Sequence, residues 1–183
     1  MSLLSYDELR ALQDAGVVLH SAPEHVNSAS IDVTLGPVIM REEDSQWPAA
    51  AYREVVLRDR YHLAMLRHEI PKEGVLIRPG EFILAQTEQV FNLPLDLSAE
   101  YKLKSSMARN GLNHFIAGWC DAGWNGSVLT LELVNQSRFH AIRLHVGVPI
   151  GQVIFFRHRP VPVSAGYGAR GRYNGDLSVQ GAK

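Results

Sequence analysis

Short extended segments separated by turn-forming residues run through most of this sequence, and they constrain its fold more than any other feature. Residues 30–36 alternate apolar and polar side chains, and similar extended stretches occupy 75–77, 81–91, 127–135 and 152–156. Gly, Pro, Asn and Asp separate these stretches, with 15 Gly and nine Pro in 183 residues. Many short strands broken by such residues predict an all-β domain, either a barrel or a sandwich.

One helix is predicted near the N-terminus. Ser5 and Glu8 have the spacing of a capping box, in which each side chain bonds a free backbone N–H at the helix start. Leu9 and Leu12 then provide a short apolar stripe, and Gly16 is a suitable end. We therefore expect a short N-terminal helix beside the strands.

The length suits a single domain over residues 1–183. Residues 41–72 carry many charges of both signs and are expected to leave the sheet. Residues 164–183 are rich in glycine and nearly free of large aliphatic side chains. We expect them to form a mobile tail that does not contribute to the core.

Charge and cysteine content exclude several classes of protein. The net charge is −1, whereas a general nucleic-acid or membrane-surface binder usually has a basic excess. Cys120 is the single cysteine, so an internal disulfide and the usual multi-cysteine zinc sites are excluded. The first twelve residues do not resemble a signal peptide, and no apolar run is long enough to span a bilayer. We expect a soluble, cytoplasmic protein.

The segment from Lys104 to Arg109 is a candidate anion site. Ser105 and Ser106 are predicted to cap a short helical turn, where free N–H groups and Lys104 suit a negative ligand. In a helix, Ser105 and Arg109 share a face. An ordinary capped helix with solvated ends explains the same residues, and the residues alone favour that interpretation.

Glu132 is the most unusual charge in the sequence. It lies in a segment, 128–134, whose alternating faces are both largely apolar, so a strand there is expected to be covered on both sides. A carboxylate in such a place needs a partner, or burial raises its pKa toward the range useful for proton transfer. A structural glutamate paired with an arginine, such as Arg109, is the alternative, and the two interpretations are compatible.

Asp121 and Trp124 flank the turn formed by Ala122 and Gly123. An aspartate at the end of an extended segment is suited to accept a hydrogen bond from a sugar hydroxyl, with an aromatic ring packed nearby. It is equally suited to start the turn. The sequence leaves both roles open.

Together these segments resemble the dCTP deaminase family, within the trimeric dUTPase-like superfamily. The matching motifs are spread over nearly the whole chain, at residues 28–36, 78–87, 105–109, 121–126, 130–133, 149–152 and 172–173. The resemblance implies a distorted β-barrel of the β-clip type, a C-terminal tail that closes as a lid, and a homotrimer with active sites between subunits.

The activity implied by the resemblance is zinc-independent hydrolysis of dCTP to dUTP and ammonia, which supplies dUTP as a precursor of dTTP. No protein side chain is implied as a metal ligand, because Mg²⁺ is expected to bind through the nucleotide phosphates. dTTP is a candidate inhibitor, and neither nucleic acid nor membrane is an expected partner.

The resemblance also assigns roles to individual residues. Glu132 is the implied general acid/base, with Ser105 and Arg109 holding the water, the base and the carboxylate. Phosphate binding falls to Lys104, Ser106, Arg109 and Arg172. Asp121 matches the residue on the 3′-hydroxyl, and Ala117 matches the backbone position that reads the base. The remaining expected substrate contacts are Trp124, Thr130, Gln152, Tyr167 and Tyr173.

Several positions depart from the family pattern. Residues 110–114 are one residue short, and the stretch between Gly126 and Glu132 is one residue long, so a β-bulge is expected to aim Glu132. Ile116 replaces a small or hydroxyl residue, and Asp176 stands where a tail glutamine is typical.

Two alternatives to the dCTP-to-dUTP reaction stay open. A dUTPase, or a bifunctional enzyme that carries dCTP to dUMP, would use Asp121 to orient a water toward the α-phosphate. A non-catalytic nucleotide-binding regulator would account for the changed loop lengths and for Asp176.

Overall fold

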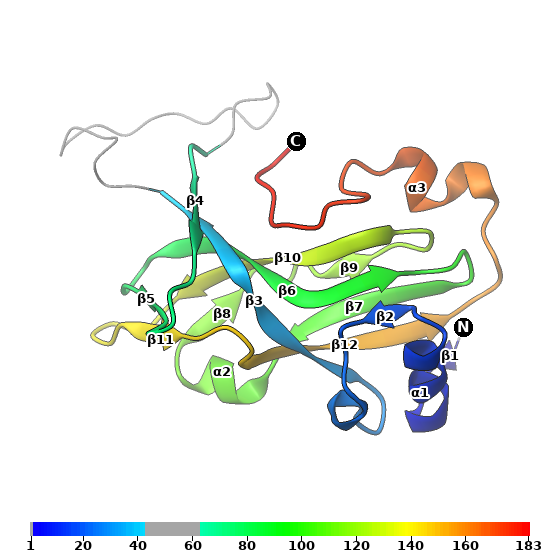
Figure 1. The fold of residues 1–183 in the computed structure, drawn as a ribbon, viewed down its shortest axis with the longest axis horizontal. Helices are drawn as coiled ribbons and strands as arrows, with labels where there is room; N and C mark the ends of the chain where they lie inside the picture. Colours follow the sequence, from blue (N-terminus) through cyan, green and yellow to red (C-terminus); the bar gives the residue numbers. More distant parts are fainter. Residues whose placement is uncertain (1, 43–62) are drawn as a thin grey trace.

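The computed structural model describes residues 2–42 and 63–183, and strands dominate them (Figure 1). The strands are β1 (Ser2–Leu3), β2 (Val18–Leu19), β3 (Ile31–Arg41), β4 (Leu66–Glu69), β5 (Val75–Ile77), β6 (Phe82–Asn92), β7 (Leu97–Leu103), β8 (Leu112–His114), β9 (Trp119–Cys120), β10 (Asn125–Asn135), β11 (Ile142–Leu144) and β12 (Pro149–Arg157). The helices are α1 (Tyr6–Asp14), α2 (Ser105–Arg109) and α3 (Tyr167–Arg170), with 3₁₀ turns at Pro23–His25 and Val163–Ala165. The all-β prediction is confirmed.

One curled sheet holds most of the described strands. Its main path runs β8-β10-β6-β3-β12-β7-β9, with β1, β2 and β4 paired at its sides and β5 with β11 forming a separate pair. The curl follows from β3, because residues 31–34 pair with β12 and residues 35–41 pair with β6. A strand that leaves one partner strand for another forms a corner, and the sheet curls over the inward-facing side chains of that strand. Ile31, Val33 and Leu35 are fully buried inside this bend.

The N-terminal helix is confirmed as α1. The Ser5 backbone N–H donates to Glu8 Oε2 at 3.0 Å, as a capping box requires. Leu9 and Leu12 are buried against the sheet, and Gly16 follows the helix with a φ of 71°. None of the helices in the described ranges is long and apolar enough to cross a membrane.

The expected excursion from the sheet over residues 41–72 is wrong at its C-terminal end. Residues 66–69 form β4, which pairs with residues 38–41 of β3. The side chains of β4 are mostly exposed. Its sequence therefore lacks the alternation of apolar and polar residues that marks a strand. β4 forms because its backbone pairs with that of β3. The central part of the expected excursion, residues 43–62, lies outside the described residues.

The C-terminal tail packs on the outer side of β10 and β6 (Figure 1). Val179 is 2% exposed and joins Val38 and Leu84 in a small apolar cluster. The buried Gln86 side chain of β6 accepts hydrogen bonds from the Val179 N–H and the Ser178 hydroxyl, both at 3.0 Å. The expectation that the tail does not contribute to a core is therefore wrong, because the buried amide of a distant strand anchors it. Its mobility stays a prediction.

Candidate active site

A cavity of about 420 Å³ lies between the outer face of β10 and the C-terminal tail. Its size is within the range of small-molecule sites, and it combines apolar walls with a few polar groups, as such sites do. It is lined by Leu63, Met65, Phe82, Leu84, Ala117, Trp119, Cys120, Asp121, Trp124, Val128, Leu129, Thr130, Glu132, Tyr167, Tyr173, Asp176, Gln180, Gly181 and Ala182. The walls therefore come from β6, β9 and β10, and the tail forms the roof.

Glu132 projects from β10 into this cavity beside Thr130. Leu131 and Leu133, on the opposite face, are buried in the core. Burial raises the pKa of the Glu132 carboxyl above its ordinary value of 4.5, and a hydrogen bond from its own backbone N–H offsets part of the rise. Among the described residues no cation pairs with Glu132, so the expected partnership with Arg109 is absent within one chain.

Two irregularities in the pairing of β10 with β6 set the direction of Glu132. Asn125 and Ser127 oppose the adjacent residues Asn92 and Phe91, so Gly126, with a φ of 64°, is the extra residue of a bulge. Between Val128 and Thr130 the extra residues lie on β6, where the Thr87 hydroxyl accepts the Leu129 N–H at 3.0 Å. An irregularity between Gly126 and Glu132 is therefore present as predicted, but its extra residues lie on β6, and the extra residue of β10 is Gly126 itself.

Asp121 combines both roles that the sequence left open. Its backbone carbonyl accepts the Trp124 N–H at 3.2 Å and closes the turn, in which Gly123 has a φ of 83°. Its side chain lies in the cavity wall, where Oδ1 accepts a hydrogen bond from the Trp119 indole N–H at 2.8 Å. Asp121 is thus a second carboxylate in the same cavity as Glu132.

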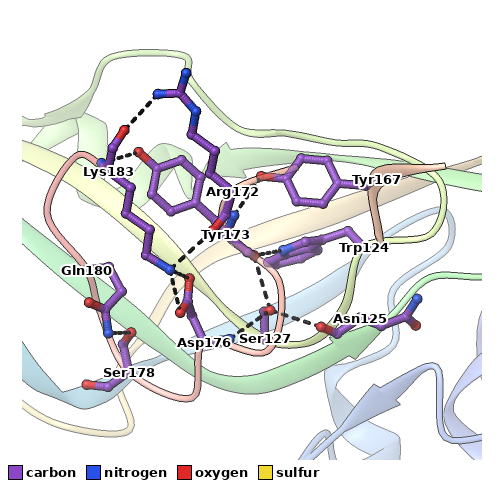
Figure 2. Close-up of polar contacts among 10 residues, drawn as sticks. All are labelled: Trp124, Asn125, Ser127, Tyr167, Arg172, Tyr173, Asp176, Ser178, Gln180 and Lys183. Carbon is purple, nitrogen blue, oxygen red and sulfur yellow. Dashed lines mark hydrogen bonds and ion pairs between the residues drawn. The ribbon is translucent and has the colours of Figure 1, made fainter. Parts of the chain in front are cut away.

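Trp124 anchors the tail at the inner end of the cavity. Its ring stacks on Phe91 with the centroids 5.5 Å apart, and its indole N–H donates to the Tyr173 carbonyl oxygen at 2.7 Å. The Ser127 hydroxyl lies within hydrogen-bonding distance of the same carbonyl, at 3.3 Å, and accepts the Asp176 N–H (Figure 2). Since its N–H is engaged by the tail, Trp124 offers a substrate apolar ring surface and not a hydrogen-bond donor.

A cluster of charged and aromatic side chains closes the tail into a loop. Lys183 Nζ lies 2.7 and 2.6 Å from the two carboxylate oxygens of Asp176 and 5.4 Å from the centre of the Tyr173 ring (Figure 2). The Arg172 guanidinium donates to the Lys183 carbonyl oxygen at 2.7 Å. The negative charge that Asp176 brings to the tail is therefore neutralised by Lys183.

The predicted phosphate-binding segment lies away from the cavity. α2 is at the opposite side of the sheet from the tail, and no described lining residue comes from 104–109 (Figure 1). Lys104 is the N-cap of α2 and pairs with Asp32 at 2.5 Å, so the prediction that the serine pair caps the turn is wrong. Ser105, Ser106 and Arg109 are exposed. One chain therefore holds two separate groups of the predicted site residues.

Of the remaining predicted residues, some line the cavity and two lie outside it. Ala117, Thr130, Tyr167 and Tyr173 line the cavity with Asp121, Trp124 and Glu132. Gln152 lies on β12, where its Oε1 accepts the Ser30 hydroxyl at 3.1 Å, and it does not line the cavity. Arg172 is also outside the lining, although it adjoins Tyr173.

Sequence reasoning missed two polar residues of the cavity, Trp119 and Gln180. Gln180 reaches the cavity four residues beyond Asp176, the position at which the family pattern places its glutamine. The signal in the sequence that could have identified Gln180 as a cavity residue is a glutamine followed by a glycine, Gly181, in the tail. Trp119 is two residues from Asp121, so strand alternation could have placed both on one face. The apolar wall at Leu63, Met65, Phe82 and Leu84 had no local signal.

The cavity offers no metal cage in the part of the chain that the structure describes. No group of three or more His, Cys, Asp and Glu side chains gathers there in a way that could hold an ion. Burial, with a smaller contribution from Asp121, raises the pKa of the Cys120 thiol to about 12. Cys120 is thus a buried, protonated group and not a ready nucleophile.

Comparison with known proteins matches the chain to one family. The family profile described as dCTP deaminase-like matches residues 3–158, well over half of the chain. The chain belongs to the dCTP deaminase family. As a member it is an enzyme of the deaminating hydrolase class, which sets aside the non-catalytic alternative.

Relatives in this dCTP deaminase family extend over most of the chain. A protein of Methanospirillum hungatei named "dCTP deaminase, dUMP-forming" is 35% identical over 137 residues, which cover 73% of this chain and 69% of that protein. A protein of the same name from Clavibacter michiganensis is 37% identical over 158 residues, covering 85% of this chain and 76% of that protein.

A solved structure confirms the fold. The crystal structure of a 2′-deoxycytidine 5′-triphosphate deaminase from Agrobacterium tumefaciens superposes with a TM-score of 0.63 at 24% identity. The match covers 84% of this chain but 47% of that chain, so this chain spans about half its length. The fold that the resemblance to dCTP deaminases implies is therefore confirmed.

Proposed function

We propose that the protein hydrolyses the 4-amino group of dCTP and carries the product on to dUMP. Two relatives with more than a third of their aligned residues identical are named dUMP-forming, which favours the bifunctional reaction over the simpler expectation that dUTP is released. The observation that carries the deaminase activity is Glu132, a carboxyl with a raised pKa in the wall of a ligand-sized cavity.

Glu132 supplies the proton transfer that deamination at C4 requires. Its carboxylate takes a proton from water as the water oxygen bonds to C4 of the cytosine. The C4–N3 double bond opens in this step, and the proton passes to N3. The proton of the new C4 hydroxyl then moves through Glu132 to the amino group, which leaves as ammonia as C4 becomes a carbonyl. A carboxyl whose pKa is raised by burial suits both steps, because it is a stronger base than an ordinary carboxylate and can still return the proton.

The other cavity residues orient the nucleoside. Asp121 is the acceptor for a sugar hydroxyl, and the exposed backbone at Ala117 faces the base. Trp124, Tyr167 and Tyr173 enclose the ligand with aromatic surface, and Thr130 lies beside Glu132. The cavity therefore binds a pyrimidine nucleoside with its reacting carbon at Glu132.

Phosphate binding requires a second copy of the chain. The cavity lining contains the acidic residues Glu132 and Asp121, an Asp176 neutralised by Lys183, and no lysine or arginine among the described residues, so a triphosphate needs cations from elsewhere. The segment from Lys104 to Arg109 carries two cations and two hydroxyls but lies apart from the cavity. We place this segment of one subunit at the cavity of the next, in a homotrimer. Mg²⁺ enters as part of the substrate, bound to phosphate oxygens as its preference for hard oxygen ligands favours.

The first test is turnover of dCTP with Mg²⁺, followed by chromatography that separates dUTP from dUMP. We expect ammonia and pyrophosphate in equal amounts, with dUMP as the product. Glu132→Gln should lower ammonia release at least about 100-fold, as expected for loss of an acid/base group. It should still bind dCTP in calorimetry.

Glu24→Gln is a matched control, because Glu24 is exposed outside the cavity. Normal turnover by Glu132→Gln would overturn the assignment of the acid/base residue. Ammonia release with dUTP as the only nucleotide product would overturn the second reaction and leave the deaminase. Inhibition by dTTP stays a prediction that the same assay measures.

A further inference from the structure

An exposed tryptophan stands in the cavity wall next to Asp121. Trp119 and Cys120 form β9, and all three residues from Trp119 to Asp121 reach the cavity wall. Cys120 is buried there, whereas Trp119 and Asp121 are exposed. The Trp119 side chain is 55% exposed, an unusual position for the largest apolar side chain. Its place in the fold is not explained by packing into the core.

Two contacts nevertheless fix the orientation of Trp119. Its ring stacks on Phe156 of β12, with 6.1 Å between the centroids and 28° between the planes. Its indole N–H donates to Asp121 Oδ1 at 2.8 Å. A hydrogen bond to a charged acceptor is stronger than one between neutral groups. The tryptophan thus ties an exposed carboxylate to the rigid sheet.

This contact leaves Asp121 with one free oxygen. Among the described residues, no donor is bonded to Asp121 Oδ2. An ionised carboxylate only accepts hydrogen bonds, so the free oxygen is a fixed acceptor in the cavity wall. Glu132, in the same cavity, has no side-chain donor on its carboxylate in the described chain and a pKa raised by burial. The two carboxylates are therefore prepared for different tasks.

We infer that Trp119 is a positioning residue, which holds Asp121 so that its free oxygen accepts a hydrogen bond from the 3′-hydroxyl of the substrate sugar. This inference rests on the proposed function. It makes Trp119 a determinant of sugar recognition, because the cavity selects a nucleotide that presents a hydroxyl to this one oxygen. Chemistry at C4 is left to Glu132.

The test replaces Trp119 with phenylalanine, which keeps a six-membered aromatic ring to pack on Phe156 and has no N–H to donate to Asp121. The KM of Trp119→Phe for dCTP should rise about tenfold, as expected for loss of a hydrogen bond to a charged group, with kcat within about twofold of the parent. With 2′,3′-dideoxy-CTP, which has no 3′-hydroxyl, parent and variant should have the same KM. A variant that merely loosened the fold would affect both substrates.

Binding is measured in parallel so that the result does not depend on turnover. Calorimetry in the Glu132→Gln background should show the same selective loss, weaker for dCTP and unchanged for the dideoxy nucleotide. An unchanged KM for dCTP, or an equal loss with both nucleotides, would overturn the role of Trp119. Absence of dCTP turnover by the parent would instead overturn the proposed function, so the two failures are distinguishable.

Discussion

The Glu132 carboxyl occupies a position that is poor for stability and good for proton transfer. Leu131 and Leu133 bury the strand on one face, and the cavity and tail cover the other. Burial disfavours the ionised carboxyl and raises its pKa, with no cation nearby in the described chain to reverse the effect. A residue that weakens the fold in its working protonation state is the mark of a functional site.

The stability of the protein should therefore depend on pH through Glu132. An acid with a raised pKa in the folded state binds its proton more tightly there than in the unfolded chain, so its contribution to stability is present below the ordinary value of 4.5 and is lost as pH rises through the folded pKa. Glu132→Gln removes this loss. Its melting temperature should exceed that of the parent at pH 8, and the difference should shrink at pH 4.

Thermal unfolding followed by circular dichroism measures the effect, with Glu24→Gln as the exposed control. A difference between Glu132→Gln and the parent that is the same at both pH values would show that burial of the charge is not its cause.

At the scale of elements, the tail is attached mainly by hydrogen bonds to β6, to β10 and to the turn before β10, with little buried apolar surface. Val179 is its single fully buried large aliphatic residue among those described, and Gln86 and Trp124 provide its main polar anchors. The ion pair between Asp176 and Lys183 joins two residues of the tail to each other and does not attach the tail to the sheet. Such a segment can open at a small free-energy cost, which suits a lid over the cavity.

Lys183→Ala should loosen the tail without unfolding the sheet. A partly exposed ion pair contributes roughly 0.2–1 kcal/mol, so backbone amides of residues 173–182 should exchange hydrogen up to about fivefold faster. Hydrogen–deuterium exchange by mass spectrometry measures this. Lys72→Ala, at an exposed turn outside the tail, is the control, and exchange in the tail that is equal in all three proteins would contradict a role for the pair.

Elements with local signals were predictable, and elements formed by distant contacts were not. The capping box at Ser5 predicted α1, and alternation around Ile31 and Leu131 predicted strands, because neighbouring residues determine both. β4 lacks that alternation, and its pairing depends on β3. The position of the tail depends on Gln86, more than ninety residues away, which no local pattern reveals.

The same distinction holds for the site. Glu132 was found because a charge interrupts an apolar alternation, and Asp121 because it precedes a turn. Gln180 was missed because it reaches the cavity only through the path of the tail. The serine pair at 105–106 was expected to cap its own turn, but Lys104 takes that place and leaves both hydroxyls exposed.

At the scale of the whole molecule, the two groups of predicted site residues lie on different parts of the surface. The cavity carries Glu132 and Asp121, whereas Arg109 and Lys104 belong to α2 across the sheet (Figure 1). In the proposed homotrimer, two copies bring these unlike surfaces together and so complete the site. Contacts of that kind close into a ring when the rotation between copies permits it.

Mixing two inactive variants tests this arrangement. Glu132→Gln and Arg109→Ala should each be inactive alone, but subunits exchanged in equal amounts should recover roughly a quarter of the parental activity, because a quarter of the sites between neighbouring copies combine an intact Glu132 with an intact Arg109. The double variant mixed with itself is the control. No recovery after confirmed subunit exchange would show that both residues serve a site within one chain.

The tail also covers a strand edge. β10 pairs with β8 only over Leu133–Asn135, and farther along the tail backbone takes the place of a neighbouring strand, with the Gly175 N–H on the Asn125 carbonyl and the Val128 N–H on the Asp176 carbonyl. An uncovered edge of this kind is a template for a strand of another molecule. The tail over the cavity therefore also shields an edge at which another molecule could add a strand, and the predicted opening of the tail would expose that edge to aggregation.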